Sequence, residues 1–160
     1  MITNQKMKML IKKAKESKKN EILQLEMNDL AMFFSPNLKQ VYDCIIISNK
    51  KEEELELGFI DAIKMHTDRT GYEASNTETP ISLCFENGIS EETAIIIGLM
   101  VIDVWSIKIK QLDKDSKYCF ILASCDGDVE VRFHKVRNNE KSWLTSDLES
   151  YNNPVGFEIR

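Results

Sequence analysis

The chain has 160 residues, of which 42% are hydrophobic, so it is long enough to form one domain with a core of its own. Only six residues are glycine and three are proline, and 29% are charged, which excludes a disordered, collagen-like or low-complexity chain. The longest apolar run, residues 94–102, is far shorter than the ~20 residues that cross a bilayer, so we expect no membrane-spanning helix.

Charge is distributed unevenly along the chain, although its net value is only -5. Residues 1–20 contain seven lysines and one glutamate, a net charge of +6, whereas residues 21–160 contain 14 basic and 25 acidic residues, a net charge of -11. An acidic body repels nucleic acid and anionic lipid and attracts basic proteins. We therefore expect a basic protein partner, and neither nucleic acid nor a membrane.

The compartment is expected to be the cytoplasm. No apolar stretch follows the N-terminal lysines, as it would in a secretion signal. The four cysteines, Cys44, Cys84, Cys119 and Cys125, lack the short paired spacing of a metal site, and two cysteines six residues apart in one strand lie about 20 Å apart. This pattern predicts reduced thiols, with no metal and no cofactor.

The N-terminal third combines one clear prediction with one open question. Thr3 or Asn4 is expected to cap a helix through about Lys18 that has a narrow apolar stripe. Residues 21–34 fit a helix, but residues 35–37 could equally form the turn of a hairpin that leads into residues 41–48. The β-branched run at residues 44–47 predicts a buried strand.

A second helix is predicted from Glu52, because apolar residues recur there at three- and four-residue steps. The acids Glu52, Glu53 and Glu54 suit its first turn, and Gly71 is expected to end it in a left-handed conformation. Residues 80–85 predict a short strand. Ser90 is expected to cap a third helix, which is apolar on every side over residues 94–102.

The C-terminal part carries the clearest local pattern, a β-hairpin. Tyr118–Ala123 is a continuous apolar strand, Asp126-Gly127 is a turn dipeptide, and apolar and polar residues alternate over residues 128–134. A short helix starting at Ser142 and a final strand at residues 155–159 complete the chain. The sequence therefore predicts an α/β (α+β) layered fold in one domain, residues 1–160, with a mixed sheet of about five strands and three or four helices. Residues 1–20 form its lysine-rich helix or arm.

Alternation in the second hairpin strand places five polar side chains on one face: Asp126, Asp128, Glu130, Arg132 and His134. The favoured interpretation is a solvated face above a buried one. Paired carboxylates near a histidine could also hold a divalent metal or divide acid and base roles, and a row of acids could serve as a docking strip for a cationic partner.

Other candidate residues have mainly structural interpretations. His66 is expected at a helix end, where it meets the last carbonyls. No phosphate loop or nucleophile motif is present, so we predict no catalytic residue. The N-terminal lysines form a solvated face or lie on the acidic body. Trp143, if it is exposed beside Tyr151, would make a hot spot for a partner.

The C-terminal half resembles small bacterial immunity proteins, the cytosolic antidotes of polymorphic and contact-dependent toxins. The resemblance lies in the helix Ser90–Gln111, the hairpin Tyr118–Val136 with its Asp-Gly-Asp turn, and the ending Trp143–Tyr151, about 70 residues in all. It implies tight, non-catalytic binding to one cognate toxin, often a nuclease whose active site is basic. No motif with assigned binding residues carries over.

The sequence thus favours a non-enzymatic protein that neutralises a basic toxin domain by occluding its active site. The predicted partner-binding residues are Asp126, Asp128, Glu130, Glu52, Glu53, Glu54 and Trp143. One alternative is a divalent-metal enzyme that uses the strip formed by Asp126, Asp128, Glu130 and His134. Another is a regulatory or scaffolding subunit, including a homodimer joined through an edge strand at residues 155–159.

Overall fold

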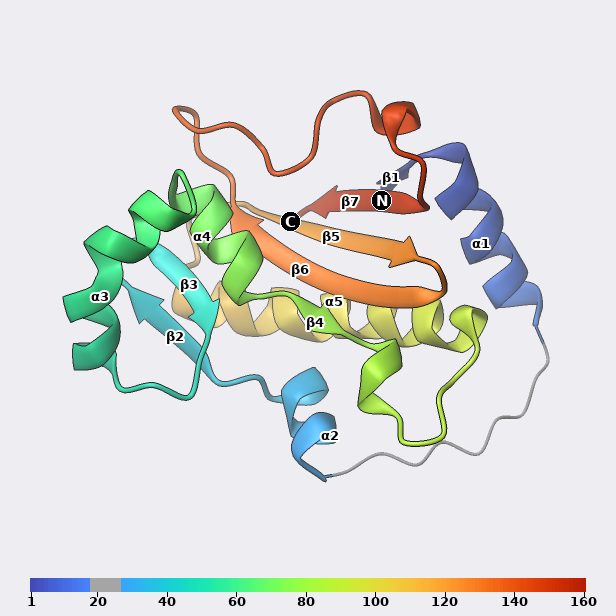
Figure 1. Ribbon diagram of the computed structural model, residues 1–160, viewed down its shortest axis with the longest axis horizontal. Coiled ribbons are helices and arrows are strands. Elements are labelled where there is room, and N and C mark those ends of the chain that lie inside the picture. The colour runs from blue at the N-terminus through green and yellow to red at the C-terminus, as the bar shows by residue number, and fades with distance from the viewer. Residues whose placement is uncertain (18–26) are drawn as a thin grey trace.

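The computed structural model describes residues 1–17 and 27–160. Its main sheet has five strands in the order β1 (Ile2–Thr3), β7 (Val155–Ile159), β5 (Tyr118–Cys125), β6 (Asp128–Lys135) and β4 (Thr79–Pro80), and neighbouring strands are antiparallel throughout (Figure 1). A separate two-stranded sheet pairs β2 (Leu38–Val41) with β3 (Cys44–Ile47). The α-helices are α1 (Gln5–Glu16), α2 (Met27–Phe34), α3 (Glu52–Met65), α4 (Arg69–Asn76) and α5 (Glu91–Leu112).

Helix α5 runs along one face of the main sheet and forms the main hydrophobic core with it (Figure 1). The indole of Trp105 is fully buried against Phe133 and donates a hydrogen bond of 2.9 Å from Nε1 to the carbonyl oxygen of Phe33. Gly98 allows the close approach, because a Cβ atom there would lie 2.6 Å from Cδ1 of Leu122. Helix α1 packs beside α5 through the predicted stripe, of which Met7, Leu10 and Ala14 are buried.

A second hydrophobic cluster lies between β2, β3, α3 and α4. Its buried residues are Val41, Cys44, Ile46, Leu55, Phe59 and Tyr72. The side chain of Glu73, on α4, joins this cluster to the main sheet, since its carboxylate accepts hydrogen bonds of 2.8 Å from the backbone N–H groups of Ile45 and Lys135. Backbone donors of β3 and β6 are thereby satisfied by one side chain.

The other face of the main sheet is covered by residues 138–154, which we call the covering segment. Leu144, Leu148 and Tyr151 pack there against Cys119, Ile121, Val155 and Phe157. On the same face of the sheet, the β6 residues Arg132 and His134 are buried. The sheet is therefore enclosed on both sides, by α5 on one and by irregular chain on the other.

The α+β class predicted from the sequence is confirmed. Helices α1 and α5 begin as predicted, with Asn4 and Ser90 as N-caps whose side chains accept hydrogen bonds from Met7 N and Thr93 N. The β5–β6 hairpin turns at Asp126-Gly127 with positive φ angles of 52° and 91°, as the two-residue turn requires.

The predicted role of Gly71 is wrong. Helix α3 ends at Met65, and it is Thr67 that takes a positive φ of 74°. Gly71 lies inside α4, where a Cβ atom would meet the carbonyl oxygen of His66 at 2.3 Å. Glycine is needed at this position because the chain entering α4 turns back so that the His66 carbonyl, five residues earlier, lies against Gly71.

Two further predicted elements differ in the structure. The strand expected at residues 80–85 is reduced to β4, followed by the 3₁₀ turn η1 (Ser82–Cys84), because the Ser82 hydroxyl occupies the N–H of Val129 at 3.0 Å. The helix expected from Ser142 is one 3₁₀ turn, η2 (Leu148–Ser150), since the Asp147 carbonyl and carboxylate are engaged locally by Thr145, Glu149 and Ser150.

The open question about residues 21–34 is answered for part of that range. Residues 27–34 are helical, whereas Lys18, Lys19 and residues 21–26 lie outside the described residues. The hairpin of β2 and β3 turns at Tyr42-Asp43, with Tyr42 at a φ of 53°, and not at residues 35–37. Within the described ranges, no helix is both long and apolar enough to span a membrane.

Candidate partner-binding groove

The polar strip of β6 starts at the hairpin tip and runs beneath the covering segment. Alternation is as expected, but the strip is not a solvated face: Arg132 is only 9% exposed and His134 only 2%. Asp126 and Asp128 are exposed, and Glu130 is half-buried. The strip therefore changes along its length from exposed acids to enclosed basic groups.

Arg132 organises the middle of the strip. Its Nη2 lies 3.0 Å from Oε2 of Glu78 and also donates to the carboxylate of Glu130. The Trp143 ring lies over the guanidinium, with 5.4 Å between Cζ and the ring centroid, a distance typical of a cation–π contact. Two carboxylates and one aromatic ring thus hold Arg132 in a single position.

A groove of about 280 Å³ opens beside Trp143. Trp143, Leu144 and Tyr151 of the covering segment form one wall, while strand residues that include Ile121 and Glu130 form the other. Trp143 is 41% exposed. The Tyr151 hydroxyl accepts a hydrogen bond of 3.0 Å from Thr145 N, which fixes the wall formed by the covering segment. Aromatic side chains at an open, largely apolar groove are typical of hot spots in protein interfaces.

The hairpin tip supplies negative charge next to this groove. Asp126 and Asp128 are exposed, and neither makes an ion pair with any residue in the described ranges. Cys125, which also lines the groove, is exposed, and its Sγ lies 3.9 Å from the Asp126 carboxylate. Four of the predicted partner-binding residues, Asp126, Asp128, Glu130 and Trp143, therefore share one end of the main sheet.

The other three predicted residues lie elsewhere. Glu52, Glu53 and Glu54 form the first turn of α3, and Figure 1 places α3 and the β5–β6 turn at opposite ends of the long axis. Glu52 lies 3.9 Å from Lys39 Nζ, and Glu54 lines a hollow of about 650 Å³ together with Lys50 and Lys51. These acids suit the positive end of the helix dipole and are partly balanced by nearby lysines.

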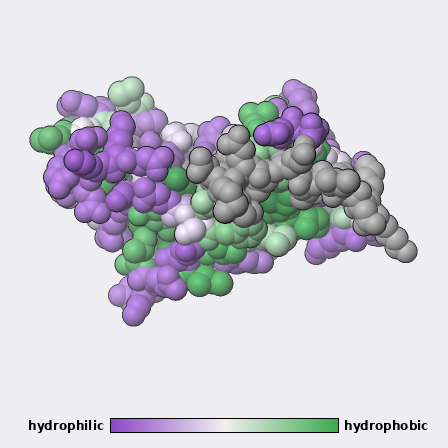
Figure 2. Space-filling model, turned by 90° about the horizontal axis from the view of Figure 1, so that it is seen from below, coloured by the Kyte–Doolittle hydropathy of each residue, from purple (hydrophilic) through white to green (hydrophobic). Residues whose placement is uncertain are grey.

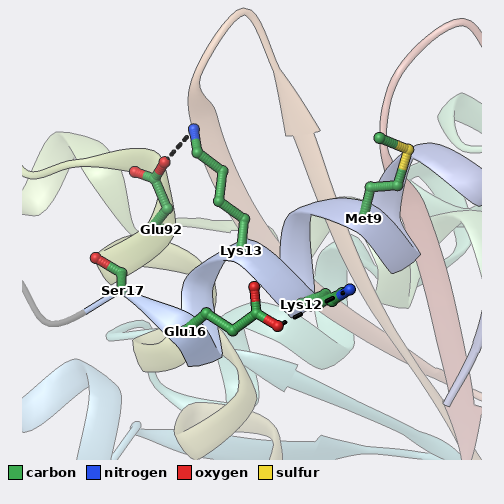
Figure 3. A pocket seen from close by; sticks show the side chains of 6 residues that line it. All are labelled: Met9, Lys12, Lys13, Glu16, Ser17 and Glu92. Carbon is green, nitrogen blue, oxygen red and sulfur yellow. Dashed lines mark ion pairs between the residues drawn. The ribbon is translucent and has the colours of Figure 1, made fainter.

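The N-terminal lysines partly confirm the expectation that the basic segment lies on the acidic body. A hollow of about 560 Å³ runs beside α1, and Lys13 forms an ion pair across it with Glu92 of α5 (Figure 3). Hydrogen bonding to Glu92 raises the pKa of Lys13. Lys12 pairs with Glu16 on its own helix at 3.9 Å, and both side chains are well exposed.

Two alternatives from the sequence receive little support from the geometry. Within residues 1–17 and 27–160, no three His, Cys, Asp or Glu side chains are grouped as a metal site would require. Strand β7 lies between β1 and β5, so the prediction that residues 155–159 form an edge strand is wrong. His66 is the C-cap of α3, as expected, and its ring packs 5.9 Å from that of Tyr72.

The sequence interpretation missed a buried ionic network. Arg137 is held by Glu73, with 2.7 Å between Nη1 and Oε2, and by Asp43, to which Nη2 donates at 2.9 Å through the backbone carbonyl. Burial raises the pKa of Glu73, opposed by hydrogen bonds from Arg137 and the backbone, while hydrogen bonding to Glu73 helps to raise that of Arg137 against burial. No local spacing signals this pair, because its members are 64 residues apart.

The fold defines an α+β protein whose antiparallel sheet is enclosed between a long helix and an irregular covering segment, with a groove at the hairpin end. The chain belongs to the Uncharacterized protein PM0498 family, whose model matches residues 2–160. Searches of curated proteins and of solved structures return no match.

Proposed function

We propose that the protein is a non-enzymatic inhibitor that binds a cognate basic toxin domain, a nuclease, and occludes its active site. One observation carries the proposal: the half-exposed indole of Trp143 borders a groove next to the exposed carboxylates of Asp126 and Asp128. The net charge of -11 over residues 21–160 and the resemblance of the C-terminal half to immunity proteins support it. Cytoplasmic location belongs to the same proposal.

The two halves of the site have different roles in binding. Exposed carboxylates at the hairpin tip raise the rate of encounter with a cationic surface, because long-range attraction guides diffusion. Trp143 inserts into the partner and slows dissociation, since a buried aromatic anchor contributes most of the binding energy of such interfaces. A nuclease site shaped for a polyanion would meet the acids of the hairpin in place of its substrate.

The proposal predicts that a toxin domain is encoded next to this chain, and that domain is used for the test. Co-expression of the two proteins is expected to restore the growth that the toxin alone stops. In stopped-flow measurements at physiological salt, the double variant Asp126→Lys/Asp128→Lys is expected to associate about tenfold more slowly. Trp143→Ala is expected to dissociate faster, with binding weakened by about 2 kcal/mol or more.

A charge-matched control distinguishes the effect of acids beside the groove from the effect of the protein's overall negative charge. The double variant Glu52→Lys/Glu53→Lys makes the same change in net charge at the other end of the molecule, and we expect it to leave the association rate nearly unchanged at physiological salt. Equal slowing by both double variants, or full binding by Trp143→Ala, would contradict the proposed site. Growth arrest that persists on co-expression would contradict toxin neutralisation.

A further inference from the structure

Helix α5 carries a row of uncharged, mainly apolar side chains on the face that points away from the main sheet. The members recur at steps of four and three residues, and they are Thr93, Ile97, Met100, Val104, Ile107 and Gln111. Met100 is 49% exposed and Ile107 is 62% exposed, while Ile97 and Val104 are half-buried. The buried residues of α5 lie on its other side, where the helix packs on the sheet (Figure 1).

The spacing of this row is that of a helix-pairing seam. Steps of four and three residues average 3.5, the period that keeps a line of side chains facing a second helix over its whole length. From residue 93 to residue 111 the row covers about 27 Å of helix, at about 1.5 Å per residue. The described part of the chain leaves the seam open, as the exposure of Met100 and Ile107 shows.

The charged side chains next to the row are engaged within the chain. Asp103 forms an ion pair with Arg160, with 2.6 Å between Oδ1 and Nη2. Lys110 donates from Nζ to the carbonyl oxygen of Ser116 at 2.9 Å. The face therefore offers little attraction to the basic partner proposed for the Trp143 groove, and it suits a partner surface that is itself neutral and apolar.

The row has the same character when it is read from either end. Its order is polar, isoleucine, apolar, apolar, isoleucine, polar, with the midpoint at Ile102. If two copies pack antiparallel about a two-fold axis there, Ile97 faces Ile107 of the second copy, and Met100 faces Val104 of the second copy. An interface with two-fold symmetry requires a patch that complements itself in this way.

We propose that the protein forms a two-fold symmetric dimer in which α5 packs antiparallel against α5 of a second copy. The two helix dipoles then oppose each other, which is the favourable arrangement for neighbouring helices. The covering segment and the Trp143 groove lie on the other face of the sheet, so each copy keeps its groove open. The dimer therefore does not depend on toxin binding.

The dimer is tested first by its mass. Sedimentation equilibrium over a series of protein concentrations is expected to show an average mass that approaches twice that of one chain. Ile107→Lys is expected to return the mass of one chain, because the change places a lysine from each copy in the apolar seam. The matched control is Leu57→Lys on α3, where the side chain is 89% exposed, and it is expected to leave the dimer intact.

Cross-linking tests the antiparallel order of the helices. The variants Ile97→Cys and Ile107→Cys are prepared with Cys125→Ser, which removes an exposed native thiol. In the proposed dimer each new cysteine lies about 15 Å along the helix axis from its own counterpart, too far for a disulfide, but next to the other new cysteine. Air oxidation is therefore expected to link two chains only when the two variants are mixed.

Three outcomes would overturn the proposal. These are the mass of one chain at every concentration of the unaltered protein, a dimer that Ile107→Lys leaves intact, and a disulfide that joins Ile107→Cys chains to one another without the second variant. The first is measured on the unaltered protein, so the test remains decisive even if Ile107→Lys folds poorly. None of these measurements involves the toxin, so failure of the dimer and failure of the proposed function are distinguished.

Discussion

The burial of His134 has a consequence for stability. Burial is the main cause of its lowered pKa, and the charge of Arg137 lowers the pKa further, whereas the hydrogen bond to the Lys135 carbonyl opposes them. The unfolded chain restores a pKa near ~6.5, so protonation favours the unfolded state. The stabilisation is complete above that value and is lost as the pH falls from it towards the lower pKa of the folded protein.

We therefore expect the free energy of unfolding to fall as the pH drops below about 6.5 in the unaltered protein, and to fall much less in His134→Leu. Urea unfolding at a series of pH values measures the difference. Carboxyl groups with lowered pKa, such as Asp113, where hydrogen bonds from Lys135 and Ser116 outweigh burial, contribute only at still lower pH. Parallel loss of stability in both proteins would show that His134 does not titrate on unfolding.

At the scale of elements, some features follow from the local sequence pattern, whereas others depend on contacts that the pattern does not show. The hairpin and the N-caps of α1 and α5 depend on neighbouring residues, so the sequence predicts them well. The role of Gly71 was predicted wrongly although the excluding atom, the His66 carbonyl oxygen, lies only five residues earlier, because the left-handed turn is made by Thr67. The burial of Arg132 was not predicted from the sequence either. The covering segment is irregular chain, and its sequence has no periodic apolar pattern that would show that it packs on β6.

Two helical glycines illustrate the same contrast and give a paired prediction. Gly98→Ala is expected to lower the free energy of unfolding by about 1–3 kcal/mol, because the new methyl group meets Leu122 and Val131 in the core. Gly58→Ala, on α3, is expected to raise it by about 0.5–1 kcal/mol, since no atom lies within 4 Å of the added carbon. Urea unfolding of both variants checks the signs, and a stabilised Gly98→Ala would contradict the packing of α5.

The acidic row of the candidate site was predicted from the sequence, but the groove beside it was not. Strand alternation correctly placed Asp128 and Glu130 on one face, and the turn dipeptide correctly placed Asp126 at the tip. Strand alternation could not show that Trp143 would lie over Arg132, because that contact joins a strand to irregular chain. Glu52, Glu53 and Glu54 are also acidic, but they belong to α3, which lies far from the β5–β6 turn (Figure 1).

On the scale of the whole molecule, two hydrophobic clusters meet across a polar junction. One cluster lies between β2, β3, α3 and α4, and the other between α5 and the main sheet, with Glu73 and Arg137 at the junction. Ile45 of β3 belongs to the second cluster, and Leu38 and Ile47 pack against it. Figure 2, seen from below, also shows extensive hydrophobic surface around the middle of the molecule and mainly hydrophilic residues near its left end. The relative position of the two parts thus depends on a buried ion pair as well as on the apolar packing of β3.

Removing one partner of that pair is expected to be costly. Arg137→Met leaves Glu73 buried without its cation, so we expect the free energy of unfolding to fall by about 3–5 kcal/mol, with amide hydrogen exchange accelerated first in β3 and α4. The matched control is Arg69→Met. Its ion pair with Asp43 at 3.0 Å joins side chains that are 45% and 40% exposed, so the expected loss is below about 1 kcal/mol. Similar losses in both variants would contradict a special role for the junction.

The position of β7 between β1 and β5 has a consequence for how the protein is made. Because a ribosome synthesises β7 after every other strand, the sheet lacks an interior member until residues 155–159 have left the exit tunnel. Until then β5 exposes one unpaired edge, and Asn4, which donates to the Asn153 carbonyl at 2.8 Å and accepts from Val155 N at 3.2 Å, has no partner there. Nascent chains therefore remain open to chaperones and proteases until β7 has been synthesised and has paired with β5.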